Sequence, residues 1–282
     1  MHRQYLREIK ETLSAKNYPQ SDAEDLLLHC LRISYTDLYS RDIDMTPDEI
    51  AATSHMVERR LNGEPIAHII GSKEFLGQTF KVTADTLIPR PETEILVNEV
   101  IKRFKSSNIT SARILEIGTG SGCIIVSIIR ALKNSGYNVT GVAIDISEAA
   151  LLVARENAEV MAVSDSIEFI RCSIGDFTDR NFDIVISNPP YIPTNDILSL
   201  ETSVKDYEPH IALDGGSDGL DFYREIAKIL SEIEKCILGI EFGIGQSSAI
   251  LDILGKQHNI EIIRDLAQIE RIIICEKNEI HL

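Results

Sequence analysis

The segment Asn188-Pro189-Pro190-Tyr191 combines residue types that can hold a planar amino group. Proline has a fixed φ and no N–H, so two prolines in succession make a stiff loop that holds Asn188 and the neighbouring carbonyls in one geometry. The Asn188 side-chain oxygen and the Pro189 carbonyl are both acceptors, and two acceptors could grip both hydrogens of an –NH2 group. Tyr191 offers a flat face to pack on that group. The alternative is a proline-rich turn in which Asn188 is only a local cap.

A second candidate site is the glycine-rich run Gly118-Thr119-Gly120-Ser121-Gly122, between the apolar segment 114–117 and an apolar helix through Leu132. Glycines let a ligand approach the backbone, and a helix N-terminus offers free N–H groups. A dinucleotide fingerprint would need a glycine at position 123, where this chain has Cys123. The spacing therefore fits S-adenosylmethionine better than NAD. The next apolar segment ends in Asp145, which is placed to accept from ribose hydroxyls.

Other residues that could bind a ligand are fewer. Phe177 follows a third predicted strand and could flank an adenine by packing, although it could equally be an ordinary core residue. The five cysteines include no C-x-x-C pair and the seven histidines show no ligand spacing. We therefore expect reduced thiols and no metal site.

Each of these candidates follows a segment that reads as a buried strand, and ligands of open α/β sheets lie beyond the carboxyl ends of strands. From about residue 91, strands and helices alternate. This alternation predicts an α/β fold with a doubly wound, mostly parallel, seven-stranded Rossmann-like sheet. Strands are predicted at 112–117, 139–145, 167–171, 182–187, 235–242, 259–264 and 271–276, and helices near 91–104, 121–134, 147–163, 218–231 and 246–255.

The first part of the chain has a different pattern. Residues 1–74 read as a small helical bundle, with capping boxes at 21–24 and 46–49, the second followed by a helix to Leu61. Alternation around Gly77 predicts a β-hairpin within a linker over 75–90, and Pro91 can open the first helix of a catalytic domain over 91–282. The bundle lacks catalytic groups, so we expect it to recognise a substrate or to act as a structural cap.

Composition narrows the class of protein further. The chain has 282 residues, 44% of them hydrophobic, without a continuous apolar run long enough to span a membrane or an N-terminal signal segment. These features favour a cytoplasmic protein. The net charge of −16 argues against stable binding of bare nucleic acid and permits a basic protein partner, although it could serve solubility alone.

Together the motifs resemble the PrmC/HemK family, the peptide chain release factor N(5)-glutamine methyltransferases. The resemblance covers nearly the whole chain and one residue departs from it, Gln268, where such proteins usually have glycine. The matching segments are 63–66, 71–75, 87–94, 116–122, 188–191, 207–209, 212–213, 216, 218–220 and 241–243.

The resemblance implies a function. The expected reaction transfers a methyl group from S-adenosyl-L-methionine to the glutamine amide of the Gly-Gly-Gln loop of bacterial class I release factors. It implies that Asn188, Pro189, Pro190 and Tyr191 bind the amide and carry catalysis. The donor would be bound by Gly118, Thr119, Gly120, Ser121, Gly122, Asp145, Phe177 and Asn188. Two alternatives remain: a nucleic-acid amino-methyltransferase, or a donor-binding docking protein that is not an enzyme.

Overall fold

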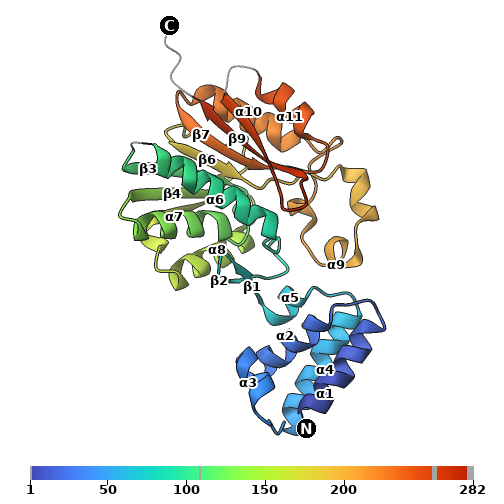
Figure 1. Cartoon of the computed structure of the whole chain (residues 1–282). Coiled ribbons are helices and arrows are strands. Elements are labelled where there is room, and N and C mark those ends of the chain that lie inside the picture. The colour runs from blue at the N-terminus through green and yellow to red at the C-terminus, as the bar shows by residue number, and fades with distance from the viewer. Residues whose placement is uncertain (1, 108, 256–258, 278–282) are drawn as a thin grey trace. The chain divides into compact units, whose positions relative to one another are not determined.

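The computed structural model describes residues 2–107, 109–255 and 259–277, and the chain forms two compact units (Figure 1). The helical unit comprises Met1–Ser72 and Glu201–Tyr207, and the sheet unit comprises Lys73–Leu200 and Glu208–Leu282.

Five helices make up most of the helical unit: α1 His2–Ser14, α2 Gln20–Leu31, α3 Tyr35–Ser40, α4 Pro47–Leu61 and α5 Ile66–Ile70. Their apolar faces share one core that includes Leu13, Leu26 and Leu27. The predicted capping box of α4 is confirmed, with Thr46 and Glu49 each bonding the other's backbone and Pro47 in the first turn.

The capping box predicted at 21–24 is wrong. Helix α2 already begins at Gln20 after Pro19, without a side-chain cap. Glu24 instead accepts hydrogen bonds from Lys10, Tyr35 and Tyr39, so its carboxylate links three helices. A long-range ion pair has replaced the local bond that the spacing suggested.

A segment distant in sequence completes the helical unit. The short helix α9 Thr202–Lys205 belongs to it. The Tyr207 hydroxyl donates to the Asn62 carbonyl at 3.0 Å, and a Cβ on Gly63 would lie 3.0 Å from the Thr202 Cγ2. Gly63 thus leaves room for a segment that the chain reaches only after most of the sheet.

The predicted hairpin is present as β1 Ser72–Phe75 and β2 Gln78–Lys81. Leu76 and Gly77 form its turn, both with positive φ, at 50° and 69°. The Leu76 N–H donates to the Glu94 carboxylate at 2.9 Å, which ties the turn to the first turn of helix α6. As predicted, α6 opens at Pro91.

The sheet unit is built on seven strands in the order β5-β4-β3-β6-β7-β9-β8. They are parallel except for β9, which runs antiparallel to both of its neighbours. All seven predicted strands are confirmed, although β6 is shorter than expected. Their bounds are β3 Ser111–Ile117, β4 Asn138–Asp145, β5 Ile167–Arg171, β6 Ile184–Ser187, β7 Cys236–Glu241, β8 Asn259–Arg264 and β9 Glu270–Lys277.

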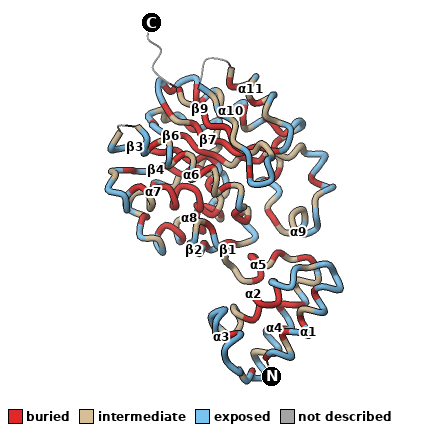
Figure 2. Tube along the Cα trace, viewed as in Figure 1, coloured by how far each residue is buried: buried red, intermediate tan, exposed pale blue. Residues whose placement is uncertain are grey.

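Helices cover both faces of this sheet (Figure 2), and successive residues of a strand face opposite cores. Ile114 packs against α6 Pro91–Ser106, α7 Cys123–Asn134 and α8 Glu148–Val160, whereas Leu115 packs against α10 Asp221–Glu232 and α11 Ser247–Leu254. Burial on both faces explains why these strands read as continuous apolar runs. The loops beyond their carboxyl ends are left to form the site.

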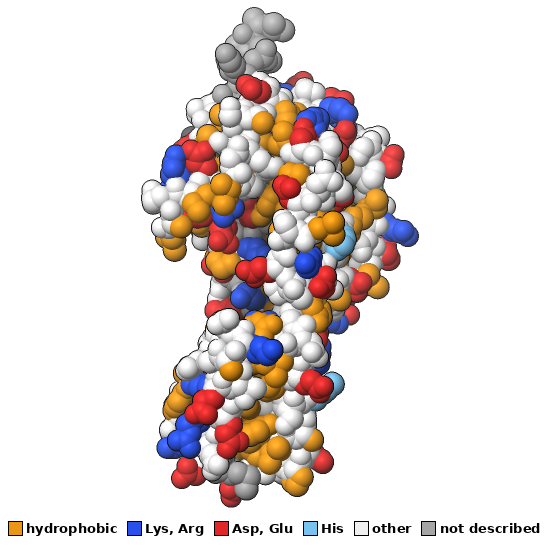
Figure 3. All heavy atoms as spheres, turned by 90° about the vertical axis from the view of Figure 1, so that its right-hand side faces the viewer, with side chains coloured by type: hydrophobic (Ala, Val, Ile, Leu, Met, Phe, Trp, Pro, Cys, Tyr) orange, Lys and Arg blue, Asp and Glu red, His pale blue; other side chains and the backbone are white. Residues whose placement is uncertain are grey.

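The long segment 193–219 contains the short helices η2 Thr194–Ser199, α9 and η3 His210–Ala212. Within the described ranges, no helix is long and apolar enough to cross a membrane. On the face shown in Figure 3, acidic and basic side chains are interspersed with hydrophobic ones on both units.

Candidate active site

The site lies where the order of the strands reverses. Strands β3 and β6 are neighbours, and the chain continues outward from β3 through β4 and β5, and from β6 through β7. A crevice opens at such a point beyond the carboxyl ends of the strands. The Ser187 hydroxyl, at the end of β6, donates to the Ile117 carbonyl at the end of β3 at 2.7 Å and is fully buried. This hydrogen bond joins the ends of β3 and β6 at the base of the crevice.

A pocket of about 240 Å³ occupies this position. Its lining includes five of the predicted site residues, which come from the end of β4 and the loops after β3 and β6: Gly118, Gly120, Asp145, Asn188 and Pro190. The other walls are largely apolar and include Leu87, Ile146, Ile174, Ile211 and Phe222. Three loops that are far apart in sequence therefore share one cavity.

The glycines of the first loop have different tasks. All three have positive φ, at 72° for Gly118, 52° for Gly120 and 77° for Gly122. A Cβ on Gly118 or Gly120 would meet nothing within 4 Å, so these two face open space at the pocket. A Cβ on Gly122 would lie 3.0 Å from the Ala154 Cβ, so Gly122 serves the packing of α8.

Thr119 and Ser121, between these glycines, do not line the pocket. Thr119 is buried and donates its hydroxyl to Glu116, while the Ser121 carbonyl accepts from the Asn157 amide at 2.8 Å. Glu116 is fully buried, and burial raises its pKa to about 8. These buried contacts hold the backbone of the glycine-rich turn in place.

Asp145 ends strand β4 and holds two loops. Its Oδ2 accepts from the Gly120 N–H and its Oδ1 accepts from the Ser147 N–H, both at 2.9 Å. Burial raises the pKa of this carboxyl. Each carboxylate oxygen has a second lone pair, so Asp145 can still accept from a ligand in the pocket that it lines.

Asn188 lies at the end of a buried chain of hydrogen bonds. Its Nδ2 donates to Thr93 Oγ1 at 3.1 Å, and Thr93 Oγ1 donates to Glu241 Oε2 at 2.7 Å. Burial raises the pKa of Glu241 to about 7. The Asn188 Oδ1 is shielded from solvent and has no hydrogen-bond partner within the described part of the chain. An acceptor left over in this way is free to accept from a donor on a bound molecule.

The backbone of the Asn188–Tyr191 turn is held by a glycine-rich loop and by Gln246. A Cβ on Gly215 would lie 2.9 Å from the Pro190 oxygen, and one on Gly219 would lie 2.4 Å from the Tyr191 oxygen. Gln246 Nε2 donates to that same Tyr191 oxygen at 2.9 Å. Only glycine allows the loop to approach the turn this closely.

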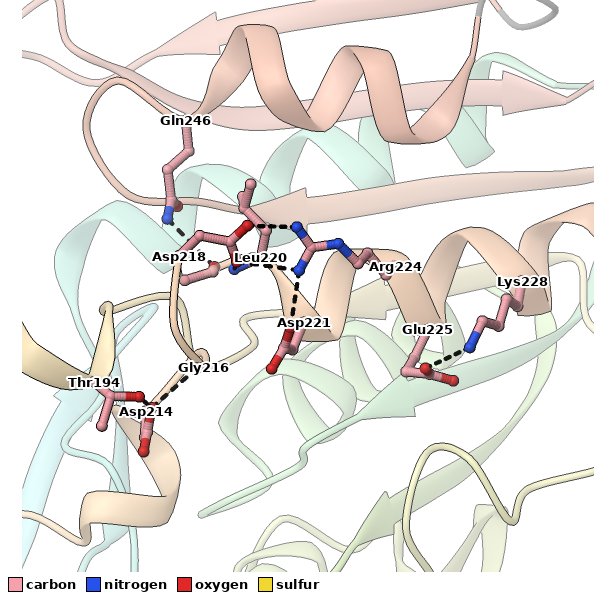
Figure 4. Close-up of polar contacts among 11 residues, drawn as sticks. Thr194, Asp214, Gly216, Asp218, Leu220, Asp221, Arg224, Glu225, Lys228 and Gln246 are labelled. Carbon is pink, nitrogen blue, oxygen red and sulfur yellow. Dashed lines mark hydrogen bonds and ion pairs between the residues drawn. The ribbon is translucent and has the colours of Figure 1, made fainter.

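Polar contacts fix the glycine-rich loop in turn (Figure 4). Asp214 Oδ1 accepts from the Thr194 hydroxyl at 2.7 Å and from the Gly216 N–H at 2.9 Å. Arg224, on α10, pairs with Asp218 and with Asp221. The loop is therefore held at both ends, which makes it a firm support for the turn.

Two predicted aromatic residues lie beside the pocket and do not line it. Tyr191 packs against the core on the α10 side of the sheet, and burial raises its pKa to about 12. Phe177 is buried in the same core with its ring 6.0 Å from that of Phe182. Phe177 therefore lies where the alternative interpretation, an ordinary core residue, would place it.

Sequence reasoning assigned no role to Thr93, Glu241 or Gln246. Thr93 lies in the segment 87–94 and Glu241 in the segment 241–243, and both segments were noted only as matches to the family. In the structure Arg90 pairs with the buried Glu208, which also accepts from the Ile88 N–H at 3.0 Å. The polar residues of these segments hold the site together through contacts between distant parts of the sequence.

Comparison with known proteins identifies the family. Residues 4–71 match the PrmC N-terminal domain family, and residues 110–238 match a methyltransferase domain family. The release factor glutamine methyltransferase of Thermodesulfovibrio yellowstonii is 35% identical over 281 residues, which cover 97% of this chain and 98% of that protein. The one from Geobacter sulfurreducens is 39% identical over 238 residues, or 83% and 81% of the two chains. The chain belongs to the release factor glutamine methyltransferase family.

Solved structures of lower identity share the fold. A methyltransferase from Pyrococcus furiosus superimposes with a TM-score of 0.51 at 17% identity, covering 80% of this chain and 99% of that one. The hMettl16 catalytic domain, solved with an RNA hairpin, gives a TM-score of 0.54 at 15% identity, covering 85% of each chain. The fold of this chain is therefore shared with methyltransferases of low sequence identity.

Proposed function

We propose that this enzyme transfers a methyl group from S-adenosyl-L-methionine to the side-chain amide nitrogen of glutamine in the Gly-Gly-Gln motif of bacterial class I release factors. Membership of the family supports the reaction. The observation that carries the assignment of the site is that Asn188, which lines the pocket, has a side-chain oxygen with no hydrogen-bond partner in the ranges that the structure describes. An acceptor in this place suits the hydrogens of an amide –NH2 group.

The residues of the pocket fit the methyl donor. Gly118 and Gly120 leave open the space that a Cβ would fill, which permits close approach of a ligand to the backbone. Asp145 has lone pairs free for ribose hydroxyls, and apolar side chains such as Ile146 and Ile174 suit the adenine. When bound, S-adenosylmethionine supplies an electrophilic methyl group.

The chain's own contribution is to orient the acceptor. An amide nitrogen is a poor nucleophile because its lone pair is delocalised into the carbonyl. We assign Asn188 Oδ1 and the Pro189 carbonyl to the two hydrogens of the –NH2. Tyr191, which packs against the core and does not line the pocket, we assign to supporting the turn near the amide plane. Pro190 keeps the turn stiff. Alignment of this kind contributes several kcal/mol, up to ~7–11 in favourable intramolecular reactions.

We assign recognition of the release factor to the helical unit, which carries none of the pocket residues. The net charge of −16 supports a basic protein partner over nucleic acid. Release factors act on cytoplasmic ribosomes, so we place the enzyme in the cytoplasm.

The test incubates the enzyme and methyl-labelled donor with a release factor, with the same factor carrying alanine in place of the Gly-Gly-Gln glutamine, or with DNA. Label on the wild-type factor alone, located on that glutamine by peptide mass spectrometry, is the expected result. Label on DNA would favour the nucleic-acid alternative. Donor binding without transfer to either substrate would favour a docking protein.

A further inference from the structure

We propose that Thr93 and Glu241 are positioning residues that decide which end of the Asn188 amide faces the acceptor nitrogen. This inference rests on the proposed function. It starts from the chain of hydrogen bonds that leads from Asn188 through Thr93 to Glu241. Thr93 and Glu241 are each only 2% exposed, so water does not compete for these bonds.

The two ends of an asparagine amide have nearly the same shape, so packing alone does not choose between them. Hydrogen bonding does choose. An oxygen presented to the substrate –NH2 accepts a hydrogen, whereas an –NH2 presented to it sets donor against donor. The orientation of Asn188 therefore matters as much as its position.

Thr93 determines which end of the Asn188 amide faces the substrate, because a hydroxyl has only one hydrogen to donate. An ionised Glu241 is purely an acceptor, so Thr93 gives its hydrogen to Glu241 at 2.7 Å. The Thr93 oxygen can then only accept from Asn188, whose Nδ2 lies 3.1 Å away. The Asn188 oxygen is left without a partner among the described residues, as observed, and is the end that can accept from a substrate.

Protonation of Glu241 would reverse the direction of these hydrogen bonds. A protonated carboxyl can donate to Thr93, which frees the Thr93 hydrogen for Asn188 and favours the turned amide. Burial raises the pKa of Glu241 to about 7, so this change in protonation falls near neutral pH. Several ionisable groups interact electrostatically with Glu241. They lie at the start of α6, in the Asn188–Tyr191 turn, and on α7, α10 and β9: Arg90, Glu92, Tyr191, Cys123, Tyr223 and Arg271.

The variants that test this inference are Thr93→Val, Thr93→Ser and Glu241→Gln. Single-turnover methyl transfer to a release factor, with both substrates saturating, should fall about tenfold in Thr93→Val, the order of effect of one hydrogen bond. Donor affinity by calorimetry should not change, and Thr93→Ser should recover most of the rate. Thr86→Val is the matched control, because Thr86 lies in the sheet unit and is also buried. Its hydroxyl donates to the Thr83 carbonyl at 3.2 Å, and Thr86 does not line the pocket.

The pH profile distinguishes orientation from simple packing. Wild-type transfer should fall as the pH drops through about 7, where Glu241 gains its proton. Glu241→Gln cannot ionise, so its rate should be lower at pH 8 and flat across this range. A Thr93→Val rate equal to that of the control, or a Glu241→Gln profile with the wild-type inflection, would overturn the inference.

A measurement without substrates separates this inference from the proposed function. In ¹⁵N-labelled enzyme, the side-chain NH2 resonances of Asn188 should shift with pH with a midpoint near 7, and should stay constant in Glu241→Gln. If wild-type enzyme leaves release factor unmethylated, the proposed function fails while this titration still tests the relay. If methylation is normal and the Asn188 resonances do not respond to pH, the relay alone is wrong.

Discussion

At the scale of single residues, Asn188 and Gln268 show how far side-chain chemistry can be inferred from sequence. The acceptor role that we propose for Asn188 follows from its residue type between a strand and two prolines. Its orientation depends on Thr93 and Glu241, which lie 95 and 53 positions away in the sequence respectively. Local sequence patterns do not encode a contact of that range.

Gln268 departs from the family at a position whose backbone favours glycine. It lies between β8 and β9 with φ of 64°, in the left-handed region. A side chain there costs roughly 1–2 kcal/mol, partly offset by the entropy that glycine loses on folding. We expect Gln268→Gly to raise the free energy of unfolding by about 0.5–1 kcal/mol in urea titrations. Ala267→Gly is the control and should lower it. A loss of stability in Gln268→Gly would contradict this account of the turn.

Glu116 should make stability depend on pH. Burial raises its pKa from an ordinary 4.5 to about 8. Because the folded pKa is the higher one, the stability contributed by this carboxyl is complete below about pH 4.5 and is lost as the pH rises to about 8. Glu116→Gln is neutral throughout, so its free energy of unfolding should fall less than that of wild type between pH 5 and pH 8.

Glu159→Gln changes an exposed carboxylate and is the control for Glu116→Gln. Its free energy of unfolding should depend on pH as that of wild type does. Urea unfolding at the two pH values measures all three proteins. Equal losses in wild type and Glu116→Gln would mean that Glu116 is not held with a raised pKa.

At the scale of elements, regular structure was predicted well and irregular structure poorly. The seven strands of the sheet were found because burial on both faces makes them apolar throughout, and helices α6, α7, α8, α10 and α11 because strands and helices alternate. The start of α2 was wrong because Glu24 pairs with Lys10 instead of capping its own helix. The segment 201–207 joins the helical unit through tertiary contacts that no periodicity reveals.

The loop 214–221 is the element that most directly supports the Asn188–Tyr191 turn. A Cβ on Gly219 would lie 2.4 Å from the Tyr191 oxygen, so Gly219→Ala should displace the turn and slow methyl transfer. Crowding of this kind also destabilises, typically by ~1–3 kcal/mol.

Gly136→Ala is the matched control for Gly219→Ala. Both glycines have positive φ, at 87° and 75°, but a Cβ on Gly136 would meet nothing within 4 Å. The control therefore carries the backbone strain without the crowding. Urea unfolding and single-turnover rates of the two variants should differ, and equal values would mean that the close approach at Gly219 is unimportant.

At the scale of the whole molecule, we propose that the sheet unit carries catalysis and the helical unit carries substrate recognition. The sheet unit holds every residue that lines the pocket, and the helical unit holds none. Removal of Met1–Ser72 should therefore leave donor affinity unchanged and sharply weaken methylation of full-length release factor. Methylation of a short Gly-Gly-Gln peptide should be far less affected. Normal methylation of the full-length factor by the truncated enzyme would exclude a recognition role for the helical unit.

The central claim is that Asn188 holds the acceptor nitrogen in line for methyl transfer. The most direct test is single-turnover transfer to release factor by Asn188→Ala with saturating donor. Loss of one well-aimed polar contact at a reacting centre typically lowers turnover ~10²–10³-fold, while donor affinity should fall far less because Gly118, Gly120 and Asp145 remain. A rate close to that of wild type would show that Asn188 is only a turn residue and would contradict the claim.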